Sequence, residues 1–134
     1  MESTIFQIKD LIPFHVTDWS CVEKTNHHGE TGTASWRTLQ LGSLRIRVVE
    51  YSKGYKANHW CKKGHILYCL DGEITTELQD GRTFLLKKGM SYHVSDDLSS
   101  HRSFTENGAT LLIMDGGFLN IQNHRDTIRN PWRM

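Results

Sequence analysis

The 134-residue sequence lacks any strong charge imbalance and any long apolar run, and each absence excludes a class of protein. Sixteen lysines and arginines against fifteen acidic residues leave a formal net charge of +1. A strongly basic chain would have suggested nucleic acid as a partner, and this balance does not. No apolar run approaches the ~18 residues that a membrane-spanning helix needs. We therefore expect neither a nucleic-acid partner nor a membrane partner.

Cysteine is also scarce, with only Cys21, Cys61 and Cys69, none of them in a C-x-x-C pair. A secreted domain held by disulfides has an even and denser set of cysteines. The first ten residues include the acidic Glu2 and no apolar stretch typical of a signal peptide. We therefore expect a reduced, cytoplasmic protein. Its length predicts one domain that folds without needing disulfides or a structural metal.

Several common catalytic signatures are missing as well. The sequence has no P-loop, no G-x-G-x-x-G, no G-x-S-x-G elbow and no H-E-x-x-H. Nucleotide binding, serine hydrolysis and zinc-protease chemistry therefore lack their usual sequence signals.

What the sequence does have is a series of short strand and turn signals. The dipeptides Asp71-Gly72 and Asp80-Gly81 are typical of hairpin turns. Strands at 8–12-residue spacing, few prolines and no long helical period predict an all-β sandwich or barrel. The strand candidates are residues 44–51, 73–78, 83–86, 90–94, 101–105 and 110–114.

We divide the chain into an N-terminal arm with short strands (1–40), a barrel core (41–116) and a C-terminal tail (117–134). The tail is expected to be anchored by Phe118, Ile121 and Trp132. Residues 65–70 are apolar on both faces, so both faces of this strand should be covered. The barrel interior covers one face, and the arm or a second subunit covers the other. The sequence therefore predicts a homodimer formed through the 65–71 region.

Four strong metal-ligand side chains gather around two turns. His59 and Cys61 are two residues apart, so on a strand they share a face. Lys62-Lys63-Gly64 is interpreted as a tight turn that brings His65 into a neighbouring strand. His101 begins another strand after a polar turn. Three imidazoles and a thiolate suit Zn, Fe, Ni or Cu better than Mg or Ca.

The stretch from Gly54 to Gly72 resembles the first motif of the cupin superfamily, G-x5-H-x-H-x3-4-E-x6-G. His59 stands at the first histidine position, Cys61 at the second and His65 at the glutamate position, with a first spacer one residue shorter. The resemblance implies a double-stranded β-helix whose interior often holds one metal, in proteins that range from dioxygenases and isomerases to non-catalytic binders.

The stretch from Gly89 to Thr105 resembles the second cupin motif, G-x5-P-x-G-x2-H-x3-N. Ser95 replaces the proline, Asp97 replaces the glycine, and His101 arrives one residue late. Thr105 stands where the motif has asparagine.

More narrowly, the chain resembles the small single-domain cupins named for a DHCW motif. The corresponding residues here are Asn58-His59-Trp60-Cys61, so an amide replaces the leading acid. The resemblance extends over about residues 13–116 and carries no assigned reaction.

Two functions remain open at this stage. The first is a metal-dependent cupin that acts on or binds a small molecule in the barrel, with His59, Cys61, His65 and His101 as ligands. If all four bound tetrahedral zinc the shell would be closed, so catalysis would need a six-coordinate metal or one ligand standing off. The second is a non-catalytic binding or sensing cupin with a structural zinc or no metal. The sequence does not decide between these two functions, and so it does not decide whether the protein is an enzyme.

Side-chain orientation leaves further alternatives. If Glu50 shared an interior face with Ile46 and Val48, it would be a candidate general base, but an exposed acid at the strand end is the simpler interpretation. One of Tyr92 and His93 should face the pocket. Cys69 is expected to point inward as a small buried hydrophobic residue.

Overall fold

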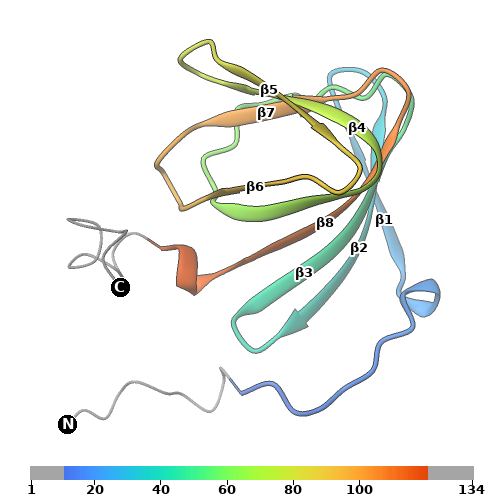
Figure 1. Ribbon diagram of the computed structural model, residues 1–134. Coiled ribbons are helices and arrows are strands. Elements are labelled where there is room, and N and C mark those ends of the chain that lie inside the picture. Colours follow the sequence, from blue (N-terminus) through green and yellow to red (C-terminus); the bar gives the residue numbers. More distant parts are fainter. Residues whose placement is uncertain (1–10, 121–134) are drawn as a thin grey trace, which may run out of the picture.

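The computed structural model describes residues 11–120, and its regular structure is almost entirely β-strand (Figure 1). Two 3-10 turns, η3 (Trp19–Cys21) and η4 (Gly117–Leu119), flank the strands. The strands are β1 (Lys24–His28), β2 (Thr33–Leu41), β3 (Leu44–Tyr51), β4 (His65–Leu78), β5 (Thr83–Lys87), β6 (Ser91–Val94), β7 (His101–Phe104) and β8 (Ala109–Gly116).

All strand pairs are antiparallel, in the order β1-β2-β3-β8-β4-β5, with β6 and β7 also paired to β4. The sheet curls so that β4 to β7 lie over β1, β2, β3 and β8 (Figure 1). This arrangement confirms the predicted all-β barrel. Residues 24–28 and 33–40, which the sequence analysis placed in the arm, belong to β1 and β2 of the same sheet.

One of the two hairpin predictions is confirmed and the other is wrong. Asp80-Gly81 joins β4 to β5, with the Gly81 N–H donating to the Leu78 carbonyl at 3.0 Å. Asp71-Gly72 instead lies inside β4, where the register with β8 shifts. Gly72 has a φ of 75°, and the irregularity bends the strand so that it pairs with β8 and β6 first and with β5 and β7 afterwards.

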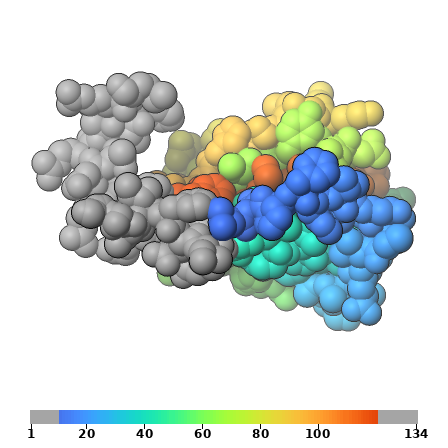
Figure 2. Space-filling view, turned by 90° about the horizontal axis from the view of Figure 1, so that it is seen from below, coloured from blue at the N-terminus to red at the C-terminus, as the bar shows by residue number. Residues whose placement is uncertain are grey.

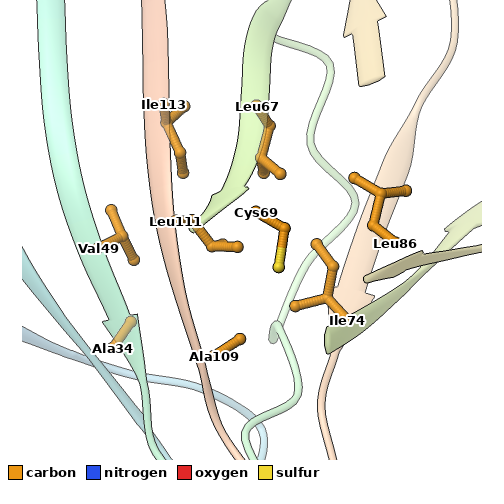
Figure 3. Close-up of a cluster of buried hydrophobic side chains, with 9 residues drawn as sticks. All are labelled: Ala34, Val49, Leu67, Cys69, Ile74, Leu86, Ala109, Leu111 and Ile113. Carbon is orange, nitrogen blue, oxygen red and sulfur yellow. The ribbon is translucent and has the colours of Figure 1, made fainter. Parts of the chain in front are cut away.

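The core lies between the curled layers (Figure 3). Leu67, Ile74 and Leu111 are 1% exposed or less, and fully burying one such side chain contributes about 1.5–3 kcal/mol. Cys69 is fully buried among them, which confirms its predicted role. All three cysteines are free. The remaining core residues are Ala34, Val49, Leu86, Ala109 and Ile113.

Residues 11–18, the described part of the arm before η3, run across the outside of the layer that contains β2, β3 and β8 (Figure 2). Its apolar side chains are largely exposed, with Phe14 at 96% and Val16 at 78%. Of the predicted tail anchors, Phe118 is in η4, while Ile121 and Trp132 lie outside the described residues. No helix in the 11–120 segment is long and apolar enough to cross a membrane.

Candidate metal and ligand site

The four predicted metal ligands all line one cavity in the barrel, with a volume of about 330 Å³. His65 begins β4 and His101 begins β7, while His59 and Cys61 lie on the irregular segment before β4. A smaller cavity of about 240 Å³ shares Tyr92 and His101 with the first. These two side chains therefore lie between the two cavities.

His65 and His101 form a buried pair with Tyr92. Their Nε2 atoms lie 3.0 Å apart, and the Tyr92 hydroxyl is 2.8 Å from His65 Nε2. Tyr92 is thus the residue of its pair that faces the site. His93 is exposed, with Nε2 3.0 Å from the Ser91 hydroxyl.

The tautomers of His59 and His101 follow from their other ring nitrogens. Nδ1 of His101 lies 2.8 Å from the Ser99 carbonyl, which can only accept, so Nδ1 carries the hydrogen and Nε2 keeps a lone pair. Nδ1 of His59 lies 2.7 Å from Asn58 Oδ1. The Asn58 amide donates to the His28 carbonyl at 3.2 Å, which fixes Oδ1 as the atom that faces His59. Both histidines therefore keep Nε2 as a ligand atom, the arrangement found around metal-bound histidines.

His65 is held neutral. Burial disfavours its charged form most, and His101 and Arg47 add to this effect, so that the pKa of His65 falls from 6.5 to about 3. A neutral imidazole is the form that binds metals.

The spacing of the histidine pair fits a metal ion in part. Two nitrogens at ~2.1 Å from one ion and 3.0 Å from each other subtend about 90°, as adjacent ligands of an octahedral shell do. Among residues 11–120, however, no three His, Cys, Asp or Glu side chains are grouped closely enough to hold an ion. The Cys61 thiol instead donates to the Lys63 carbonyl at 3.7 Å. The structure thus brings His65 and His101 together and leaves His59 and Cys61 on the wall of the same cavity.

The hairpin predicted between residues 58–61 and β4 is wrong. Cys61 pairs with β7, since its N–H donates to the His101 carbonyl at 2.7 Å and its carbonyl accepts from the His101 N–H at 3.0 Å. The convergence on one cavity therefore comes from a strand 40 residues further along the chain, which the local spacing could not reveal.

Glu50 lies outside the site. It is on the outer face of β3, exposed, and its carboxylate is 3.0 Å from the Lys24 ammonium. Glu50 is therefore an exposed acid on the surface, and the alternative in which it faces the interior as a general base is wrong.

The inward face of β3 instead carries two arginines, followed by Val49 and Tyr51. Arg45 and Arg47 both line the cavity, and both bind Asp115 of β8. Arg45 makes a bidentate pair at 3.0 and 2.8 Å, while Arg47 reaches the same carboxylate at 3.2 Å. Sequence reasoning missed this cluster. The alternation of Arg45 and Arg47 with Ile46 and Val48 was the available signal, but it did not say which side is interior.

Solved structures resemble this fold at low identity. An RmlC-like cupin from Shewanella frigidimarina aligns with a TM-score of 0.59 at 20% identity, covering 76% of this chain and 89% of that one. Ectoine synthase from P. lautus gives 0.62 at 20% identity, covering 77% and 78%. A cupin-like protein from Thermotoga maritima gives 0.62 at 16% identity, covering 75% and 84%. No family model and no curated protein matches the chain.

The chain therefore has the cupin fold, as a single-domain β-barrel of the jelly-roll type.

Proposed function

We propose that this protein is a small metal-binding cupin of the DHCW-motif type that holds a small molecule in its barrel cavity. The single observation that carries the proposal is the 3.0 Å separation of the His65 and His101 Nε2 atoms, each presented to the same cavity. His59 and Cys61 stand on that cavity as the further ligands. One structural neighbour is an iron protein, Fe(II)-HppE, with a TM-score of 0.61 at 17% identity.

A bound transition metal would supply Lewis-acid or redox chemistry to a ligand beside it. The chain's own residues divide the remaining tasks. Ser99 and Asn58 fix the tautomers of His101 and His59. Tyr92 places a hydroxyl at the histidine pair. Because burial raises the pKa of this phenol well above its usual value, the group stays protonated and can donate a hydrogen bond to a bound molecule.

The test is elemental analysis of untagged protein, because an affinity tag would itself bind metal. We expect about one equivalent of Fe, Ni, Cu or Zn per chain, and less than about one-tenth of that in His101→Ala. Asn58→Ala should retain the site with an affinity ~10–100-fold lower, since it removes only the partner of His59.

The matched control is His15→Ala, which removes an exposed histidine on the arm and should keep the full metal content. Equal metal in wild type and His101→Ala would refute the proposed site. An absence of metal from every sample would refute the metal part and leave a ligand-binding barrel.

A binding or sensing protein without turnover is the second candidate. One observation favours it: no Asp or Glu is among the residues that line the cavity within 11–120. No carboxylate is therefore placed to act as a general base there. A closed tetrahedral zinc in the elemental and spectroscopic analysis would support this candidate over the catalytic one.

We also propose a homodimer through the outer face of β4 and β8. Tyr68 and Leu70 are 40% and 39% exposed there, and Tyr68 lies opposite Leu112 in the sheet. Light scattering coupled to gel filtration should give twice the 15.5 kDa mass of one chain. Tyr68→Glu should reduce this to one chain, because the charge would be buried in the interface.

Phe84→Glu is the control for the dimer, since Phe84 is 46% exposed on β5, away from this face. A monomeric wild-type protein would disprove the interface.

The proposed compartment remains the reduced cytoplasm, which is compatible with three free thiols, one of them on the cavity wall.

A further inference from the structure

The barrel cavity is basic beyond what its internal ion pairs balance. Arg45, Arg47, Lys63 and Arg102 all line it, and no acidic side chain does within residues 11–120. Across the same residues, the ion pairs of these four involve two carboxylates, one of them Asp115. The second is Glu77, which binds Arg102 at 2.9 Å. Four cations against two anions leave an uncompensated positive charge at the cavity.

The excess positive charge is most destabilising at Arg47, because this guanidinium is buried. Its side chain is 7% exposed, and it shares the Asp115 carboxylate with Arg45, which holds both oxygens of that group. Its Nε is buried and has no hydrogen-bond partner. A buried guanidinium with an incomplete set of acceptors is destabilising unless something else supplies one. The structure retains this arginine on the cavity wall.

The walls beside Arg47 are aromatic. The Arg47 guanidinium carbon lies 4.5 Å from the centroid of the Trp36 ring. Tyr51 and Tyr55 stack with centroids 4.2 Å apart and line the same cavity. Flat apolar walls beside an incompletely paired cationic group suit a molecule that has an apolar body and one anionic end. The planar donors of a guanidinium can hold a carboxylate in bidentate geometry, and one negative charge is what a single incompletely paired arginine balances.

We propose that the cavity binds a small carboxylic acid, with its carboxylate on Arg47 and its apolar body against the Tyr51–Tyr55 pair. The inference rests on the small-molecule part of the proposed function and does not require the metal. Lys63, exposed at the cavity, adds attraction for the incoming anion.

The experiment compares benzoate with benzamide, its neutral counterpart of nearly equal size, by NMR titration of the ¹⁵N-labelled protein. We expect benzoate to bind at least about 10-fold more tightly and to shift the Arg47 Nε–H signal. Arg47→Gln should abolish the preference and identify that signal by its loss. Arg82→Gln is the matched control, because Arg82 is an exposed arginine whose ion pair with Asp80 lies at the β4–β5 turn.

Equal affinities for benzoate and benzamide would overturn the inference, and so would an equal loss in Arg82→Gln. If Arg47→Gln does not fold, the inference is judged from the wild-type protein alone, by its preference for benzoate over benzamide. The titration is repeated after chelation to separate the two proposals. A preference that disappears with the metal places the carboxylate on the metal, which overturns this inference and spares the proposed function. A preference that persists after chelation supports this inference, and the metal site is then decided separately by the elemental analysis of the untreated protein.

Discussion

Asp115→Asn is expected to lower the free energy of unfolding by about 3 kcal/mol. The Asp115 side chain is 3% exposed and is the shared counter-charge of Arg45 and Arg47. Its removal leaves a guanidinium that is 7% exposed without an ion-pair partner among the described residues. The cost of an unpaired buried charge exceeds that of the lost contact alone. Urea denaturation followed by tryptophan fluorescence measures the difference.

The matched control is Glu50→Gln, which removes a carboxylate from the exposed ion pair with Lys24. That change should cost between 0 and about 1 kcal/mol. Equal destabilisation by both substitutions would contradict the role given to Asp115.

The effect of Asp115 should also depend on pH. Burial opposes ionisation of this carboxyl, but the hydrogen bonds and charge of Arg45, with the charge of Arg47, outweigh burial and hold its pKa below 3.8. A group with a lowered folded-state pKa stabilises the protein above its unfolded pKa, and the gain is lost as pH falls through the folded value. The difference between wild type and Asp115→Asn should therefore be full above pH ~4.5 and shrink below it.

Gly72→Ala is expected to lower the free energy of unfolding by about 2–4 kcal/mol. Its φ of 75° lies where L-residues are strained, and an added Cβ would fall 2.4 Å from the Gly108 carbonyl oxygen. Because that oxygen belongs to the backbone, no side chain can move aside to relieve the contact. Thermal unfolding monitored by circular dichroism should show a clearly lowered Tm.

Gly81→Ala separates the effect of backbone strain from the effect of the steric contact with Gly108. Gly81 has a φ of 97°, but nothing lies within 4 Å of its added Cβ, so only the backbone strain remains, at about 1–2 kcal/mol. A loss of stability in Gly81→Ala as large as that in Gly72→Ala would mean that the contact with Gly108 contributes nothing.

Patterns within single strands predicted the barrel well. The β-rich run at 44–51 and the turn at Asp80-Gly81 lie where the local sequence indicates. The hairpin prediction at Asp71-Gly72 failed because a glycine with positive φ fits a bulge as readily as a turn. The choice depends on the close approach of Gly108, the residue before β8.

The sequence predicted which residues line the site better than it predicted how their side chains are arranged. The family resemblance pointed to His59, Cys61, His65 and His101, all of which line the cavity. It could not reveal Asp115, because an acid 70 positions away from Arg45 has no local signal. It also could not orient β3, whose inward face combines Arg45 and Arg47 beside the cavity with the apolar Val49.

The position of β8 has a consequence for how the chain folds as it is synthesised. β8 is the last strand of the described part, and it pairs with both β3 and β4. Strands β1 to β3 can pair early because consecutive strands are neighbours, but their edge at β3 stays open until residues 109–116 emerge. Until then two unpaired edges coexist on a partly folded chain, each able to capture a strand from another copy. Slow translation of residues 79–116 would therefore lengthen the time during which the chain can aggregate.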